Sequence, residues 1–471
     1  MTADGFSKAA PDVVDVVALG ESMVTFLPTR PGRLADVPSF ERAIGGAESN
    51  VLCALAATGH TTRWVSRVGA DGFGDHLLET IAAHGVDVTS VGRDPARPTG
   101  IYFRTAADRA TDAHEVAYYR SGSAASAMTT DNTDLPAARA ARVLHLSGIT
   151  AALSPSCLSL LQDLTAPHPA RPFISFDVNH RPGLWPHKNA PQVLLDLARR
   201  ADLVFVGEDE AEETWGITGG PEAIRAALPE PTTLVVKQGA QGATLFERQP
   251  RTNDSERVTG AVQAPTAGQP HAHEPAHVTG AAQAPVAGQL GTDESAQVRV
   301  ATQAPAAGVS RADVRGCVGG CPPAAVGAST GPASRETDSA PFRGRTPPGA
   351  PPTHPHTPGA RPAPEGTAGP DTTTFVPSPH VTVVSPIGAG DAFAAGFLSA
   401  TLRGLPPKAR LRHGHLMAAA ALTTPGDLGI PPTRHHADHL AALDDDTWGR
   451  LRLAPGWTQA PDGADEEVRT T

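Results

Sequence analysis

Short apolar runs alternate with helical patterns along most of the chain. The runs are rich in β-branched and aromatic residues and have the length of buried strands. They occupy residues 13–19, 64–68, 143–146, 173–177, 203–206, 234–237, 243–246 and 381–384. Helical patterns lie between them, notably at residues 48–58, 73–84, 193–200 and 221–228. This alternation predicts an α/β fold with a mostly parallel sheet covered by helices on both faces.

Two early stretches depart from the alternation. Residues 100–105 and 115–120 resemble paired strands around a polar turn, and residues 23–27 are a third candidate strand. Together they predict a small side sheet, with a lid drawn from about residues 21–42 and 98–121. A cover of that kind over a cleft would exclude water.

Residues 251–370 interrupt the pattern with a different composition. Their 120 residues hold 18 prolines and 16 glycines, one phenylalanine and one leucine, and no isoleucine, methionine, tryptophan or tyrosine. Such a segment buries too little apolar surface to offset about 1–2 kcal/mol of backbone entropy per residue. We predict a long, low-complexity, disordered insertion in a surface loop, because predicted strands flank it on both sides.

The rest of the chain predicts one α/β domain, made of residues 13–248 and 376–445, with a polar tail at 456–471. The net charge of −11 argues against a nucleic-acid partner, and four cysteines are too few for a disulfide framework. We find no basic N-terminal region followed by an apolar run, and no apolar run near the roughly 18 residues of a membrane span. We therefore expect a cytoplasmic protein without a membrane partner.

The strongest chemical motif is Gly388-Ala389-Gly390-Asp391, which follows a predicted strand and opens a predicted helix. Small residues at a helix N-terminus let backbone N–H groups approach an anion, and the helix dipole favours negative charge there. Asp391 could then accept a hydroxyl proton while a phosphoryl group held by those N–H groups moves onto the oxygen. The motif by itself is equally typical of a glycine-rich turn capped by Asp391.

A second motif, Gly45-Gly46-Ala47-Glu48-Ser49-Asn50, precedes another predicted helix. Paired glycines allow a polyol to lie against the backbone, and the Asn50 amide can both donate to and accept from sugar hydroxyls. A turn followed by a helix cap has the same pattern.

The two motifs together resemble the two signatures of the ribokinase-like (pfkB) carbohydrate kinases, which do without a Walker-type phosphate loop. Intervening motifs resemble the branch of that family that phosphorylates 2-dehydro-3-deoxygluconate. They are Pro98-Thr99-Gly100-Ile101-Tyr102-Phe103-Arg104, Tyr118-Tyr119-Arg120-Ser121-Gly122-Ser123-Ala124-Ala125-Ser126, His145-Leu146-Ser147-Gly148-Ile149-Thr150 and Phe176-Asp177-Val178-Asn179-His180-Arg181. The resemblance covers roughly residues 15–248 and 376–432, and it implies a ribokinase-like sheet flanked by helices.

The resemblance also implies functions for individual residues. Asp391 would be the catalytic base, with the backbone of Gly388, Ala389 and Gly390 holding the developing charge. A sugar acid carries a carboxylate that a guanidinium can bind bidentately, so Arg120 and Arg181 are the first candidates to bind it and Arg104 the third. The other implied substrate-binding residues are Gly45, Gly46, Asn50, Tyr102 and Tyr118.

ATP and Mg²⁺ are the implied cofactors, with Mg²⁺ carried by the phosphates and water rather than by direct protein ligands. Glu210 matches the acidic end of the family's Asn-x-x-Glu motif, although Gly207 replaces the Asn. Lys237, Gly239 and Gly242 resemble the loop near the nucleotide phosphates. Ser385 stands where the family often has an Asp that helps to hold a monovalent cation, so we do not predict potassium activation.

We expect an ATP-dependent kinase that phosphorylates the terminal hydroxyl of a sugar acid, with 2-dehydro-3-deoxy-D-gluconate as the expected substrate. The alternatives are a kinase of the same fold for a neutral sugar, fructose or ribose, and a catalytically inactive sugar sensor. By resemblance, the side sheet could also form a homodimer contact. His435, His436 and His439 lack further ligands at a recognisable spacing, and we interpret them as part of a solvated terminal helix.

Overall fold

The structure is a computed structural model that describes residues 12–30, 32–105, 115–185, 189–248 and 370–459. The insertion predicted at 251–370 lies outside the described residues except for its last residue. Of the predicted tail, only residues 456–459 are described.

A nine-stranded sheet runs through the described domain in the order β13-β12-β11-β10-β9-β8-β1-β4-β5. Its strands are β1 (Val14–Leu19), β4 (Thr62–Gly69), β5 (Val91–Asp94), β8 (Ala141–Ser147), β9 (Phe173–Asp177), β10 (Leu203–Gly207), β11 (Thr233–Lys237), β12 (Gly242–Arg248) and β13 (Asp371–Pro377). The strands from β5 to β11 are parallel, whereas β12 and β13 are each antiparallel to their neighbour. The predicted mostly parallel sheet is confirmed.

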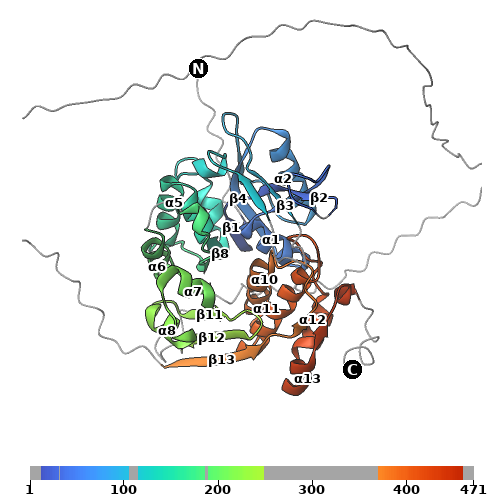
Figure 1. The fold of residues 1–471 in the computed structure, drawn as a ribbon. Coiled ribbons are helices and arrows are strands. Elements are labelled where there is room, and N and C mark those ends of the chain that lie inside the picture. The colour runs from blue at the N-terminus through green and yellow to red at the C-terminus, as the bar shows by residue number, and fades with distance from the viewer. Residues whose placement is uncertain (1–11, 31, 106–114, 186–188, 249–369, 460–471) are drawn as a thin grey trace, which may run out of the picture. The chain divides into compact units, whose positions relative to one another are not determined.

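Both faces of this sheet are buried, as the central strand β1 shows. Val16 and Ala18 pack into one apolar cluster, and Val17 and Leu19 pack into the other, because successive side chains of a strand point to opposite faces. Figure 1 shows helices on both sides of the sheet. The first cluster includes residues of α1 (Ala47–Ala57), α2 (Gly72–Ala83), α10 (Ala389–Leu402), α11 (Pro407–Leu422), α12 (Arg434–Ala441) and α13 (Asp445–Arg450). The second includes residues of α3 (Leu135–Arg139), α4 (Gly148–Leu153), α5 (Pro155–Thr165), α6 (Ala190–Arg200), α7 (Glu208–Trp215) and α8 (Gly220–Ala227).

The strand predicted at 381–384 is the main difference from the sequence analysis. The chain returns to the sheet earlier, as β13, which pairs antiparallel with β12 over its full length. Most of β13 is exposed, so this edge strand carries threonines rather than an apolar run. The apolar residues that suggested a strand contribute only the two-residue β14 (His380–Val381), paired with β15 (Arg452–Leu453).

The predicted side sheet is also confirmed, with one strand more than expected. Its order is β3-β2-β6-β7. The strands are β2 (Met23–Pro28), β3 (Phe40–Gly45), β6 (Ile101–Arg104) and β7 (Val116–Tyr119). Only residues 20–22 separate β1 from β2, so the side sheet starts at the carboxyl end of the central strand. We refer to these four strands as the small sheet.

The helix α12 carries the three histidines that the sequence analysis noted. His435 and His439 are exposed, but His436 is buried with 3% exposure and packs against Trp457, so the helix is not solvated on all sides. Among the described residues there is no group of three or more His, Cys, Asp or Glu that could hold a metal ion. Nor is any described helix long and apolar enough to cross a membrane.

Candidate active site

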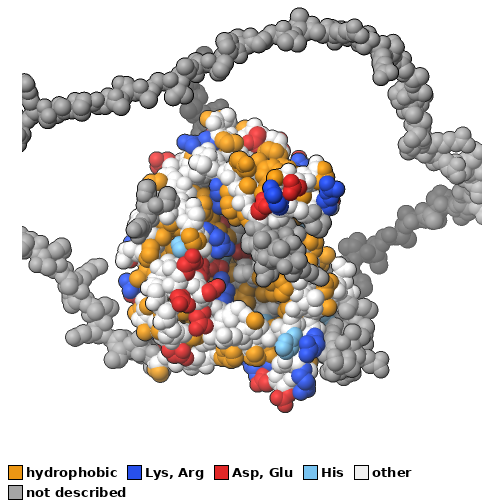
Figure 2. Space-filling view, in the orientation of Figure 1, with side chains coloured by type: hydrophobic (Ala, Val, Ile, Leu, Met, Phe, Trp, Pro, Cys, Tyr) orange, Lys and Arg blue, Asp and Glu red, His pale blue; other side chains and the backbone are white. Residues whose placement is uncertain are grey.

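A cleft of about 1680 Å³ opens at the carboxyl ends of β9, β10 and β11, beneath the small sheet. Figure 2 shows it as a hollow with acidic and basic side chains gathered on its walls. The cleft brings together most of the residues predicted from sequence. They are Gly45, Gly46, Asn50, Tyr102, Arg104, Tyr118, Arg120, Arg181, Glu210, Lys237, Gly239, Gly388, Gly390 and Asp391. Ala389 and Gly242 were also predicted, but neither residue lines the cleft.

Gly388 begins α10 in a conformation that favours glycine. Its φ is 78°, in the left-handed region, and a Cβ added there would lie 2.2 Å from the carbonyl oxygen of Asp427. The first intrahelical bond runs from the N–H of Ala392 to the carbonyl of Gly388. Helix geometry therefore leaves the preceding N–H groups, up to that of Asp391, without intrahelical acceptors at the edge of the cleft.

Asp391 lies in the first turn of α10 and contacts α1 across the cleft floor. The Asn50 Nδ2 donates to Asp391 Oδ2 at 2.9 Å. Burial raises the pKa of Asp391 to about 7, and the negative charges of Asp177 and Glu48 add to this rise. The Asn50 hydrogen bond and the positive charge of Arg181 pull the pKa in the other direction. A carboxyl group with a pKa near neutrality suits a general base.

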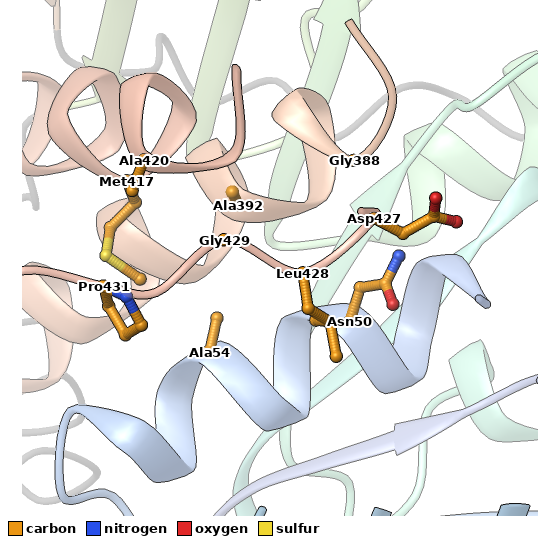
Figure 3. Close-up of a pocket in the computed structure, with 10 residues that line it drawn as sticks. All are labelled: Asn50, Ala54, Gly388, Ala392, Met417, Ala420, Asp427, Leu428, Gly429 and Pro431. Atoms are coloured by element: carbon orange, nitrogen blue, oxygen red, sulfur yellow. The ribbon is translucent and has the colours of Figure 1, made fainter. Parts of the chain in front are cut away.

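Asn50 itself has a free acceptor in this arrangement. The residue is 5% exposed, and its Oδ1 has no hydrogen-bond partner among the described residues. In Figure 3 the side chains of Asn50, on α1, and Asp427, after α11, lie near each other beside Gly388. A cavity of about 10 Å³ adjoins them. Both the donor and the acceptor of the Asn50 amide are therefore placed at the cleft floor.

Lys237, at the end of β11, lies close to the N-terminus of α10. Its Nζ is 3.1 Å from Asp177 Oδ2, and a Cβ at Gly390 would lie 3.7 Å from the same nitrogen. Burial alone would lower the pKa of Lys237, but the Asp177 and Glu210 carboxylates outweigh it and raise the pKa. The ammonium group is therefore charged and faces the same space as the α10 N–H groups.

Glu210 is held by backbone donors rather than left free. Its Oε1 accepts from the N–H of His180 at 2.5 Å, and its Oε2 accepts from the N–H of Gly207 at 3.0 Å. Gly207 is the N-cap residue of α7, and this second bond satisfies its N–H group. The helix start is therefore capped by the Glu210 side chain, although Gly207 has no side chain of its own. Burial raises the pKa of Glu210.

The three arginines predicted to bind a carboxylate have different surroundings. Arg104 Nη2 lies 2.6 Å from Asp427 Oδ1, and both side chains are buried. Arg120 Nη2 lies 2.5 Å from Glu21 Oε2. Arg181 is exposed, and the hydrogen bond that its guanidinium makes goes to the carbonyl oxygen of His180 at 3.0 Å. Arg104 and Arg120 are therefore each paired with a buried protein carboxylate, whereas Arg181 has no carboxylate partner among the described residues.

Tyr102 and Gly45 explain how the small sheet meets the cleft. The Tyr102 hydroxyl donates to Asp427 Oδ2 at 2.7 Å, and a Cβ at Gly45 would lie 2.1 Å from that hydroxyl oxygen. Tyr118 lies beside Tyr102, with ring centroids 5.4 Å apart, and is 53% exposed. Gly45 thus provides space for Tyr102, and Tyr118 presents an open aromatic face.

Sequence analysis did not predict four acidic residues that line this cleft, Asp177, Asp209, Glu213 and Asp427. Asp427 lies in Pro425-Gly426-Asp427, a combination typical of an exposed surface turn, so no signal in the sequence points to it. Asp177 ends β9 within a motif that the sequence analysis quoted. In the structure, Asn179 lies two residues later and is the only non-glycine among the described residues with a positive φ, 41°, a conformation that is often found at functional sites.

The model of the family described as pfkB family carbohydrate kinase matches residues 14–266 and 364–434. The chain belongs to the pfkB family of carbohydrate kinases. The family predicted from the motifs is thereby confirmed, and the chain is a sugar kinase.

Individual pfkB relatives differ in their sugar. The chain is 34% identical over 242 residues to the 2-dehydro-3-deoxygluconokinase of Thermoproteus tenax, which is 51% of this chain and 74% of that protein. It is 32% identical over 237 residues to fructokinase-1 of Zea mays, which is 50% of this chain and 73% of that protein. The crystal structure of a fructokinase with bound ATP from Xylella fastidiosa has the same fold, with a TM-score of 0.57, 16% identity, and coverage of 90% of this chain and 97% of that one.

Proposed function

We propose that this pfkB kinase transfers the γ-phosphoryl group of ATP to the terminal hydroxyl of a sugar acid, 2-dehydro-3-deoxy-D-gluconate. The observation that carries the proposal is Arg181. It lines the cleft, it is close enough to Asp391 to influence its pKa, and it has no carboxylate partner among the described residues. The similarity to the Thermoproteus tenax enzyme supports the same substrate.

The other basic side chains of the cleft are already paired. Arg104 pairs with Asp427, Arg120 with Glu21 and Lys237 with Asp177. Within the described part of the cleft, an anionic substrate would therefore find its uncompensated positive charge at Arg181. A guanidinium binds a carboxylate through two parallel hydrogen bonds, which also orients the sugar. A neutral sugar would leave this charge unused.

Asp391 would act as the base in the transfer. Its carboxylate accepts the proton of the terminal hydroxyl as that oxygen forms a bond to the γ-phosphorus, and the bond from phosphorus to the oxygen of ADP breaks. The N–H groups that open α10 and the Lys237 ammonium would stabilise the negative charge of the transferring phosphoryl group. Asn50 would hold Asp391 by donating a hydrogen bond from Nδ2, and its Oδ1 would accept a hydrogen bond from a sugar hydroxyl.

ATP as the phosphoryl donor is supported by the ATP bound in the related fructokinase structure. For Mg²⁺, the donor set of this chain fits an ion carried mainly by phosphates and water. The α7 carboxylates Asp209, Glu210 and Glu213 line the cleft, and Glu210 is occupied by backbone N–H groups. Mg²⁺ bound in this way would neutralise charge on the phosphates. The family's use of Lys237, Gly239 and Gly242 near those phosphates remains part of the proposal.

The alternative is a kinase for a neutral sugar, favoured by the similarity to the Zea mays fructokinase. A coupled assay of ADP release with ATP and a panel of 2-dehydro-3-deoxygluconate, fructose and ribose separates the two. We expect Arg181→Ala to lower kcat/KM for the sugar acid by about 10- to 100-fold, because the variant loses charged hydrogen bonds to the carboxylate. Any activity on fructose should be nearly unchanged.

The matched control for this experiment is Arg93→Ala, which removes an arginine from an ion pair with Asp75 outside the cleft. We expect this variant to behave like the unmodified protein. A wild-type preference for fructose or ribose, or an equal loss on acid and neutral sugars in Arg181→Ala, would exclude the sugar-acid assignment. Sugar binding without any ADP release would favour the inactive sensor.

We further propose that the small sheet covers the cleft as a lid and that its outer face contacts a second copy of the chain in the cytoplasm. Tyr102 and Tyr118 line the cleft, so the alternation of side chains directs Phe103 and Tyr119 to the opposite face. Those two rings pack edge to face with their centroids 6.0 Å apart, and Tyr119 is 65% exposed. Light scattering should give twice the mass of one chain, and Tyr119→Glu should shift the mass towards one chain. A monomeric wild-type protein would exclude the dimer.

A further inference from the structure

Glu21 is a buried carboxylate that joins the main sheet to the small sheet. It lies two residues after the end of β1 and is 3% exposed. Its Oε2 accepts from Arg120 Nε at 2.8 Å, and its Oε1 accepts from Ser123 Oγ at 2.5 Å. A Cβ at Gly100 would lie 2.8 Å from Glu21 Oε1, so glycine leaves room for this carboxylate. The side chain is thus fully enclosed in a site built from three segments.

The bonds to Glu21 use one particular edge of the Arg120 guanidinium. Nε and Nη2 both point to the same oxygen of Glu21, at 2.8 and 2.5 Å. Nη1 has no hydrogen-bond acceptor among the described residues, and Arg120 lines the cleft. A guanidinium is planar and rigid, so fixing its Nε edge also fixes the direction of its Nη1–Nη2 end. That end remains available to a ligand.

Two neighbours restrict the same arginine further. Its Cζ lies 5.9 Å from the centre of the Tyr118 ring, and the carbonyl of Arg120 accepts from the N–H of Ser123 at 3.1 Å. The turn from Arg120 to Ser123 therefore places the Ser123 hydroxyl against the Glu21 carboxylate, which also binds the Arg120 guanidinium. Glu21, Arg120 and Ser123 form one closed hydrogen-bonded unit.

We infer that Glu21 is a positioning residue for substrate recognition: it holds Arg120 so that the Nη1–Nη2 end of the guanidinium faces the polar end of the bound sugar. Because Glu21 also cancels the charge of Arg120, Arg120 supplies directed hydrogen bonds, whereas Arg181 supplies the net charge. This inference rests on the proposed function for the identity of the sugar acid. Neither Glu21 nor Ser123 was predicted as a site residue from the sequence.

The test is a double-mutant cycle with Glu21→Gln and Arg120→Ala on the full chain. Gln keeps the size of the side chain and an acceptor but loses the charge that holds the guanidinium. We expect Glu21→Gln to raise KM for the sugar about 10-fold, with kcat and the KM for ATP changed less than twofold. We expect Arg120→Ala to raise the same KM by at least that much. The double variant should then match Arg120→Ala alone, because Glu21 acts through Arg120.

Two further variants keep the inference testable if Glu21→Gln is unstable. Arg120→Lys retains the charge without the planar fork, so it should raise the sugar KM as Glu21→Gln does. The matched control is Arg93→Ala, which removes a guanidinium paired with Asp75 outside the cleft and should leave the sugar KM unchanged. Thermal unfolding of each variant separates misfolding from misplacement.

Multiplying effects of Glu21→Gln and Arg120→Ala in the double variant would overturn the inference, as would a fall in kcat with unchanged KM. Failure of the proposed function can be recognised separately, because the assay of the wild-type protein with the three sugars tests it without any variant. If the wild type phosphorylates only a neutral sugar, the cycle is measured with that sugar. Effects that are not additive would then still support Glu21 as the residue that positions Arg120.

Discussion

Asp391→Asn should lower kcat by about 10²- to 10⁴-fold, the range that a positioned general base contributes. The amide has almost the same shape but no basic oxygen for the hydroxyl proton. Asn50 can still donate to the amide oxygen in place of Asp391 Oδ2, so the first turn of α10 should keep its position. Steady-state assays of ADP release should show a sugar KM close to that of the wild type. Turnover retained at the wild-type rate would remove Asp391 from the chemical step.

The pH profile gives this prediction a second readout. Burial raises the pKa of Asp391 to about 7, and the carboxylate is the active form of a base. The kcat of the wild type should therefore fall as the pH drops below about 7, approaching a tenfold loss per pH unit. In Asp391→Asn this dependence should disappear. The matched control is Asp163→Asn, an exposed partner of Arg139, which should keep both the rate and the profile of the wild type.

Asp427→Ala should destabilise the fold by about 3–5 kcal/mol, the cost of removing one member of a buried ion pair. The substitution would leave Arg104 buried, with 2% exposure, and would remove the acceptor of the Tyr102 hydroxyl. Because Tyr102 and Arg104 belong to β6 and Asp427 follows α11, the same change would loosen the small sheet from the main body. Urea denaturation followed by far-UV circular dichroism measures the loss in the free energy of unfolding.

Controls for Asp427→Ala come from its two partners. Tyr102→Phe removes only a hydroxyl and should cost about 1 kcal/mol. The double variant Arg104→Met with Asp427→Ala should be more stable than Asp427→Ala alone, because it removes the uncompensated charge together with its partner. If the double variant is instead less stable by the sum of the two single losses, the ion pair does not account for the effect.

Most basic side chains of the cleft are paired with buried carboxylates. Glu21, Asp177 and Asp427 each lie within hydrogen-bond distance of one basic side chain. Each pair fixes a segment that the cleft needs: the turn after β7, the end of β11 and the strand β6. Such buried pairs orient side chains as much as they stabilise the fold, since an unpaired charge in these positions would be costly. Arg181, on the exposed side of the cleft, is different because no described carboxylate pairs with it.

The sequence was sufficient for the features that depend on local pattern. Apolar runs separated by helical stretches predicted the parallel sheet, because a strand buried on both faces needs apolar residues throughout. The edge strand β13 was not predicted because its exposed threonines carry no apolar signal, and β3 was not predicted because the exposed Glu41 and Arg42 interrupt its apolar residues. The glycine-rich start of α10 also followed from local chemistry, because only small residues let the backbone approach an anion.

By itself, then, the sequence determined the fold class, the pfkB motifs and the choice of Asp391 as the candidate base, all of which rest on neighbours along the chain. Only the tertiary structure decided the pairing of the charges. Arg104, Arg120 and Arg181 look alike in sequence, yet two of them face buried carboxylates, and Asp427 lies 323 residues from the arginine that it binds. Electrostatic energy depends on distance in space and on burial, and neither quantity is encoded in the local pattern of residues.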